Sequence, residues 1–108
     1  MKLANRLAFI TGGGRGIGRA IAIAFAAEGA SIAVAARTRA QVEQVVREIR
    51  DRFSNEALAL ECDVTISESV ETAFAQVNEH FGRSPDILVN NAGIVETAPF
   101  MKIGRAHV

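Results

Sequence analysis

The chain has 108 residues, of which 49% are apolar, and its formal net charge at neutral pH is zero. This length allows one domain with a hydrophobic core, and the balanced charge argues against nucleic acid or an anionic membrane as a partner. No apolar run is long enough to cross a bilayer, no signal segment precedes the first predicted strand, and the lone cysteine, Cys62, excludes an intrachain disulfide or a cysteine metal cluster. We therefore expect a soluble, cytoplasmic protein.

The first predicted elements are a buried strand, a glycine-rich turn and a helix. Residues 7–11 are apolar up to Thr11, as expected of a strand covered on both faces. Five glycines then fall between Gly12 and Gly18. A helix is predicted over residues 16–28, followed by Gly29 as its cap. Its helical spacing places four apolar residues on one face: Ile17, Ile21, Ala24 and Phe25.

Three more strands are predicted over residues 31–36, 57–61 and 86–89, separated by two amphipathic helices. In a capping box, a threonine caps the helix and a side chain three residues later reaches back to it. Two such boxes are predicted to open these helices, Thr38 with Gln41 and Thr65 with Glu68.

Strands that alternate with helices predict an α/β fold, a Rossmann-type doubly wound parallel sheet with right-handed crossovers. Ligands of such sheets bind at the carboxyl ends of the strands, near the point where strand order reverses. Unusual polar and glycine residues occur at each of these ends, in residues 11–18, at Arg37, at Asp63 and in residues 90–93. A glycine-rich turn without a ligand is the alternative, and four such strand ends argue against it.

The glycine turn has the spacing of one type of phosphate loop and not of two others. The G-x-G-x-x-G pattern fails, because Ile17 and Arg19 stand where its last glycine should be. The Walker loop fails because Arg19 and Ala20 replace its lysine and hydroxyl residue. The pattern that fits is T-G-x-x-x-G-x-G, at Thr11, Gly12, Gly16 and Gly18.

This turn, together with Asn-Asn-Ala-Gly at residues 90–93, resembles the short-chain dehydrogenase/reductase family over about residues 6–101. The resemblance implies that the turn holds a dinucleotide, that Asp63 accepts from the adenine amino group and that the backbone of Val64 helps to hold the ring. Asn90 is expected to link neighbouring strands through its amide. The implied cofactor-binding residues are Thr11, Gly12, Gly14, Arg15, Gly16, Ile17, Gly18, Arg37, Asp63, Val64, Asn90, Ala92 and Gly93.

Two arginines predict that the cofactor is NADP(H) in preference to NAD(H). Arg37 follows the second strand, where an acid would bind the 2′-hydroxyl of NAD and an arginine accommodates the 2′-phosphate of NADP. Arg15 lies within the glycine turn, and the family resemblance links basic residues at both positions to NADP(H). The alternative is that both are ordinary surface charges. Arg37 also argues against a methyltransferase-like nucleotide fold, in which an acid would hold the ribose hydroxyls.

The resemblance implies a parent enzyme that transfers a hydride between nicotinamide and a small carbonyl or alcohol substrate, as a homo-oligomer. Its catalytic serine and its Tyr-x-x-x-Lys pair lie beyond the fourth strand, and this chain contains no tyrosine. We therefore expect residues 1–101 to be the N-terminal part of a domain truncated after that strand, with no catalytic residues and no activity of its own. A non-catalytic dinucleotide-binding module is the alternative. Residues 102–108 are expected to be a non-native tail, because codons for residues 103–108 can spell a common sequencing adapter.

Overall fold

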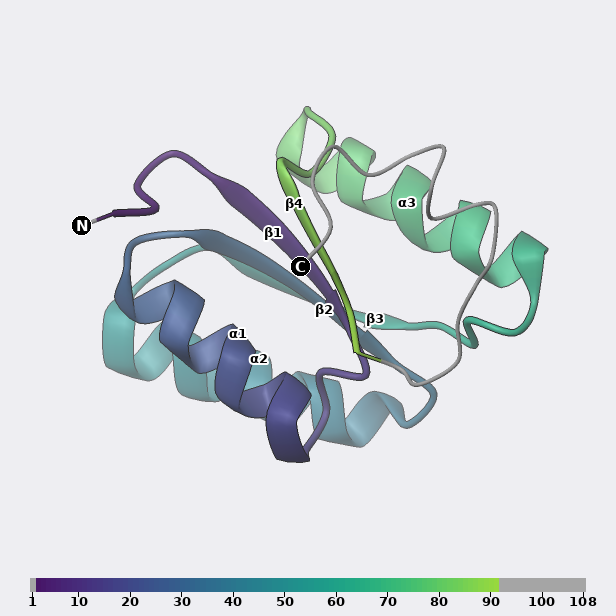
Figure 1. The fold of residues 1–108 in the computed structure, drawn as a ribbon, viewed down its shortest axis with the longest axis horizontal. Helices are drawn as coiled ribbons and strands as arrows, with labels where there is room; N and C mark the ends of the chain where they lie inside the picture. The colour runs from purple at the N-terminus through teal and green to yellow at the C-terminus, as the bar shows by residue number, and fades with distance from the viewer. Residues whose placement is uncertain (1, 92–108) are drawn as a thin grey trace.

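The computed structural model describes residues 2–91, in which strands and helices alternate without exception (Figure 1). Each predicted strand and helix is present, and most boundaries agree within one residue. In chain order the elements are β1 Leu7–Thr11, α1 Gly16–Ala27, β2 Ser31–Ala36, α2 Arg39–Phe53, β3 Ala57–Glu61, α3 Ser67–Phe81 and β4 Ile87–Asn90.

The four strands form one parallel sheet in the order β3-β2-β1-β4. From β1 the chain moves outward to β2 and β3, and then crosses back to place β4 on the other side of β1. The strand order therefore reverses between β1 and β4. Helices α1 and α2 cover one face of the sheet and α3 covers the other (Figure 1). The predicted doubly wound sheet is confirmed.

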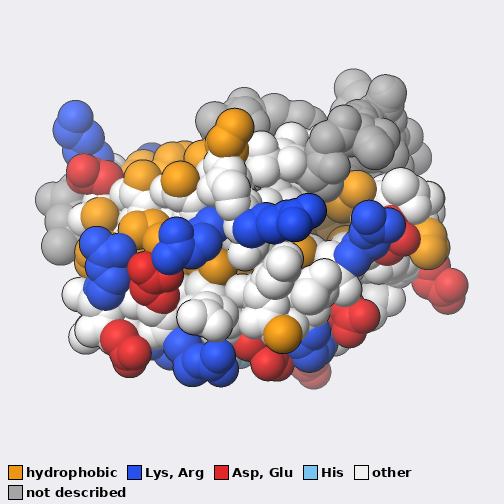
Figure 2. All heavy atoms as spheres, turned by 90° about the horizontal axis from the view of Figure 1, so that it is seen from below, with side chains coloured by type: hydrophobic (Ala, Val, Ile, Leu, Met, Phe, Trp, Pro, Cys, Tyr) orange, Lys and Arg blue, Asp and Glu red, His pale blue; other side chains and the backbone are white. Residues whose placement is uncertain are grey.

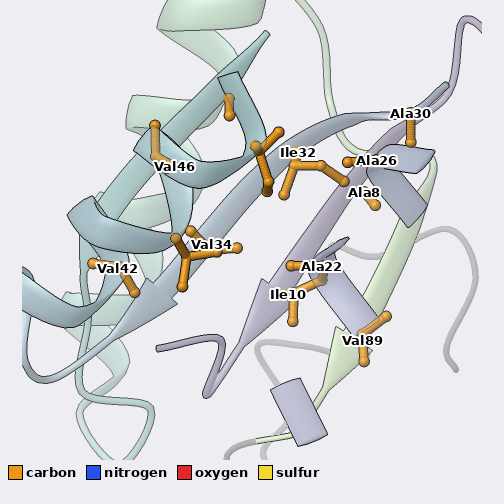
Figure 3. Close-up of a cluster of buried hydrophobic side chains, with 13 residues drawn as sticks. Ala8, Ile10, Ala22, Ala26, Ala30, Ile32, Val34, Val42, Val46 and Val89 are labelled. Atoms are coloured by element: carbon orange, nitrogen blue, oxygen red, sulfur yellow. The ribbon is translucent and has the colours of Figure 1, made fainter. Parts of the chain in front are cut away.

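The sheet separates two hydrophobic clusters, and β1 contributes to both. All five residues of β1 are buried. Ala8 and Ile10 pack towards α1 and α2 (Figure 3), whereas Leu7 and Phe9 pack towards α3. The Phe9 ring lies 4.8 Å from that of Phe74, measured between centroids. Burial of each large apolar side chain contributes about 1.5–3 kcal/mol, which is why the first four residues of this central strand are apolar on both faces.

The apolar face predicted for α1 is wrong by one position. Ile17 is 72% exposed, and the buried residues of this helix are Gly18, Ala22 and Ala26, spaced four apart. Figure 3 shows Ala22 and Ala26 directed towards the side chains of the sheet. Small residues let the helix backbone approach the strands closely, and the larger Ile21 and Phe25 are only partly buried at the side of this contact.

The predicted capping boxes are only partly confirmed. Thr38 occupies the N-cap of α2, as predicted, but makes no side-chain capping hydrogen bond. Helix α3 begins at Ser67 after Ile66, one residue later than the second box requires. Threonine side chains can bond to nearby loop groups instead of a helix end, and Thr65 bonds to Asp63 in this way. No helix within residues 2–91 combines the length and the apolar character needed to span a bilayer.

The beginnings of β1 and β4 are joined through Asp86. The Asp86 carboxylate accepts from the Leu7 N–H and from the Arg83 guanidinium, each at 2.8 Å, and the Asp86 N–H donates to the Leu7 carbonyl. Burial alone raises the pKa of Asp86, but the bonds from Leu7 and Arg83 and the charges of Arg83 and Arg6 outweigh it, so the pKa lies below its ordinary value.

We predict that Asp86→Asn lowers the free energy of unfolding at pH 7 by about 1–2 kcal/mol, because it removes a charged acceptor from two hydrogen bonds. The folded-state pKa is lowered, so the contribution is present above the unfolded-state pKa and is lost as pH falls through the folded-state value. In urea unfolding, the difference from wild type should therefore shrink below about pH 4. Asp51→Asn on the exposed side of α2 is the control and should change nothing. A pH-independent difference for Asp86→Asn would contradict this assignment.

Candidate functional site

A hollow of about 500 Å³ lies at the carboxyl ends of the strands. It lies where the loops after β1, β2 and β3 meet, close to the reversal of strand order between β1 and β4. Its lining comes from Gly12, Gly14, Arg15, Gly16, Ala36, Arg37, Thr38, Gln41, Cys62, Asp63, Val64, Thr65 and Asn91.

The glycine turn brings backbone very close to backbone. Gly12 and Gly16 have φ values of 65° and 59°, which side-chain-bearing residues rarely adopt. The Gly13 N–H donates to the Ala35 carbonyl at 3.2 Å and ties the turn to the end of β2. A Cβ atom added to Gly18 would lie 2.0 Å from the Gly12 carbonyl oxygen. The turn can therefore hold this shape only with glycine at the start of α1.

The N-terminus of α1 is suited to bind an anion. Its N-cap, Arg15, makes no side-chain capping bond, and the first turn contains no acidic residue. The free N–H groups of a helix start and its dipole both favour a negative ligand. A Cβ atom added to Gly16 would meet nothing within 4 Å, so the approach to this helix end is open among the described atoms.

A buried threonine joins the ends of β1 and β4. The Thr11 side chain is fully buried, and its hydroxyl lies 3.3 Å from both the Val89 carbonyl and Asn90 Oδ1. The same hydroxyl accepts from the Asn91 N–H at 3.1 Å. The Asn91 side-chain amide donates to the Gly12 carbonyl at 3.4 Å. The predicted link between strands through the Asn90 amide is confirmed, with Thr11 as its partner.

Two exposed arginines, Arg15 and Arg37, line the hollow. Neither forms an ion pair with a carboxylate of residues 2–91. Figure 2 shows basic side chains in a band across the face of the molecule seen from below. Cationic groups that form no such ion pair, beside a helix N-terminus, favour an anionic ligand such as a phosphate.

Asp63 is the acidic group of the hollow. Its Oδ1 accepts from the Thr65 hydroxyl at 2.6 Å and from the Thr65 N–H at 3.0 Å. The hydroxyl bond is the main reason that the pKa of Asp63 lies below its ordinary value; the backbone bond and the charge of Arg37 act in the same direction. The group is therefore a carboxylate at neutral pH, and it can only accept hydrogen bonds.

The structure brings most of the predicted site residues together. Seven of them line the hollow, whereas Thr11 and Gly18 are buried behind it and Asn90 joins the strands. Ile17 is not part of the lining, and its side chain is largely exposed. Ala92 and Gly93 lie outside the described residues. The seven predicted site residues that line the hollow are Gly12, Gly14, Arg15, Gly16, Arg37, Asp63 and Val64.

Several lining residues were not predicted as site residues. In the sequence, Thr38, Gln41 and Thr65 fit helix-capping patterns, and Asn91 stands in the Asn-Asn-Ala-Gly motif between predicted site residues. Gln41 packs so closely on the turn that a Cβ atom at Gly14 would lie 2.9 Å from Gln41 Cβ, a tertiary contact with no sequence signal. Cys62 is 4% exposed and packs in the cluster under α3; burial raises the pKa of its thiol.

Comparison with known proteins identifies relatives along nearly the whole chain. The family model described as short chain dehydrogenase matches residues 6–108. A probable 2,4-dienoyl-CoA reductase of Caenorhabditis elegans is 42% identical over 90 residues, which cover 83% of this chain and 29% of that protein. The chain thus spans less than a third of that relative's length.

Solved structures show the same fold with either cofactor. The L-sorbose reductase of Gluconobacter frateurii, solved with NADPH and L-sorbose, superposes with a TM-score of 0.81 at 36% identity, covering 94% of this chain and 39% of that one. An NAD⁺-bound xylitol dehydrogenase also has a TM-score of 0.81, at 35% identity, and covers 87% of this chain and 35% of that one. Similarity alone therefore does not select NADPH or NAD⁺ for this chain.

We predict that Gly18→Ala lowers the free energy of unfolding by about 3 kcal/mol, because its methyl group would overlap the Gly12 carbonyl and force the two backbones apart. Gly16→Ala is the matched control in the same turn. It has a positive φ but free space, and should cost about 1 kcal/mol. Chemical denaturation measures both. An equal or smaller loss for Gly18→Ala would show that the close approach does not hold the turn.

Proposed function

Because the chain belongs to the short-chain dehydrogenase/reductase family, we propose that residues 1–101 form the N-terminal part of an NADP(H)-binding domain. The hollow at the strand ends is the cofactor site. Its volume of about 500 Å³ lies within the range usual for ligand sites, roughly 300–1,000 Å³. The glycine turn, the free N-terminus of α1 and two arginines supply the donors that a dinucleotide phosphate needs.

One observation carries the preference for NADP(H). At the end of β2 the residue facing the hollow is Arg37, and Arg15 lines the same hollow from the glycine turn. Neither is neutralised by an ion pair within residues 2–91, so both are available to a further phosphate. A 2′-hydroxyl would instead need an acceptor at the end of β2, where the chain has Ala35, Ala36 and then Arg37.

The remaining strand ends bind the other parts of the dinucleotide. Asp63 and Val64, after β3, hold the adenine ring, with the carboxylate accepting from its amino group. Asn90, Ala92 and Gly93, after β4, provide small and amide-bearing residues for the ribose and nicotinamide. When bound, the nicotinamide supplies or accepts a hydride at its C4 carbon. The residues of this chain bind and orient the cofactor for that transfer.

We propose that the whole protein reduces a carbonyl or oxidises an alcohol of a small molecule. Two of the similar proteins named above, an L-sorbose reductase and a xylitol dehydrogenase, bear names of such activities. Proton transfer to the carbonyl oxygen needs a general acid, and the family resemblance assigns that role to a tyrosine. The 108 residues contain no tyrosine. On this ground the chain by itself binds the cofactor without catalysing the reaction, and a non-catalytic binding module is the second candidate.

Three further expectations stay predictions from the sequence. They are the assembly of the parent enzyme as a homo-oligomer, its cytoplasmic location, and the non-native character of residues 102–108.

We predict that the chain binds NADPH more tightly than NADH, and that Arg37→Ala weakens NADPH binding by roughly 10- to 100-fold while leaving NADH binding unchanged. The reason is the loss of a charge-assisted bond to the 2′-phosphate, worth about 1.5–3 kcal/mol. Fluorescence of the reduced nicotinamide measures both constants, and the absence of Trp and Tyr keeps the protein background low.

Arg47→Ala provides the matched control for this experiment, since Arg47 is exposed on α2 and lies outside the hollow. It should leave both affinities unchanged. Tighter binding of NADH by the wild-type chain, or equal weakening of both cofactors by Arg37→Ala, would refute the preference for NADP(H).

A further inference from the structure

The two oxygens of the Asp63 carboxylate have different surroundings. Oδ1 accepts two hydrogen bonds from a single residue, at 2.6 Å from the Thr65 hydroxyl and at 3.0 Å from the Thr65 N–H. Within residues 2–91, Oδ2 accepts none. One oxygen is therefore bound to the loop after β3, and the other is left for a ligand of the hollow that Asp63 lines.

The backbone of Asp63 is fixed as well. Its N–H donates to the Ser69 hydroxyl of α3 at 2.9 Å, and its carbonyl accepts from the Ile66 N–H at 3.1 Å. The preceding residue, Cys62, is buried in the core, and its N–H donates to the Ala36 carbonyl at the end of β2. Backbone and side chain are thus both held before any ligand arrives.

We infer that Thr65 is a positioning residue that sets the base specificity of this site. Its hydroxyl fixes the Asp63 carboxylate so that Oδ2 alone is presented to the base of the dinucleotide. The inference rests on the proposed function, in which Asp63 meets the base, and goes beyond it by assigning the discrimination to Thr65.

The hydrogen-bonding properties of the Asp63 carboxylate and of the group at position 6 of the base determine which base is preferred. A carboxylate only accepts hydrogen bonds, so it pairs with the amino group at position 6 of adenine and repels the oxygen at position 6 of hypoxanthine. A carboxylate free to rotate could turn away from the wrong base at little cost. A carboxylate that is already fixed loses less conformational entropy when it binds adenine, and it cannot turn away from the repulsive oxygen of hypoxanthine.

A purely structural role for Thr65 would be as a cap of α3, but the geometry is against it. The N-cap of α3 is Ile66, and no side chain caps this helix end. The Thr65 side chain is exposed and lines the hollow. Loss of its hydroxyl should therefore alter base discrimination much more than the stability of the helix.

The test compares NADPH with its hypoxanthine analogue, in which the adenine amino group is replaced by oxygen. The ratio of their dissociation constants is measured by nicotinamide fluorescence for the wild-type chain, Thr65→Val and Thr65→Ser. Thr72→Val, on the exposed part of α3, is the control for loss of a threonine hydroxyl. The wild-type chain should favour NADPH by roughly tenfold.

Thr65→Val keeps the shape of the side chain but should reduce this ratio by roughly threefold or more. Thr65→Ser, which keeps the hydroxyl, and Thr72→Val should both retain it. NMR titration of the Asp63 carboxyl carbon gives a readout without any ligand, in which Thr65→Val raises the pKa of Asp63 and Thr65→Ser does not.

The outcomes separate the role of Thr65 from the cofactor proposal. A Thr65→Val chain with the wild-type ratio would overturn the role of Thr65 while leaving the cofactor site intact. Equal binding of NADPH and its hypoxanthine analogue by the wild-type chain would also overturn it. A wild-type chain that binds neither compound would overturn the cofactor proposal itself, and this inference with it.

Discussion

The junction between β1 and β4 is the constraint on which the site depends. Between these strands the order of the sheet reverses. Thr11 joins their ends from the buried side, with its hydroxyl against Asn90 Oδ1 and the Asn91 N–H. The Asn91 amide then reaches the Gly12 carbonyl, so that the same junction also fixes the start of the glycine turn.

The close packing of α1 follows from this junction. Gly12 is held at the strand end, and the chain turns back there into α1. Because the helix backbone lies against the Gly12 carbonyl, position 18 must be a glycine. Ala22 and Ala26 continue that small-residue contact along the sheet. The result directs the N–H groups of the helix start towards the hollow, where Arg15 and Arg37 add positive charge. The close packing of α1 and the direction of its N–H groups towards the hollow thus both follow from the junction between β1 and β4.

Much of this arrangement could be predicted from the sequence, because it depends on local patterns. Buried strands and amphipathic helices have clear periodicities, and parallel strands bring their carboxyl ends to one edge. The errors concern contacts across the fold. The alanine-rich helix has apolar residues on every side, so its periodicity could not separate Ile17 from Gly18 as the residue facing the sheet. Thr65 and Gln41 fit local capping patterns, but Thr65 bonds to Asp63 in its own loop and Gln41 packs against Gly14 across the fold.

NMR mapping of NADPH binding tests most directly whether the four strand ends build one dinucleotide site. In a ¹⁵N-labelled chain, amide signals of residues 12–18, 36–38, 63–65 and 90–91 should shift together during titration and give one dissociation constant. Signals at the opposite ends of the strands, such as Leu7 and Ile87, should stay in place. Shifts confined to one loop, or centred away from these strand ends, would contradict the account.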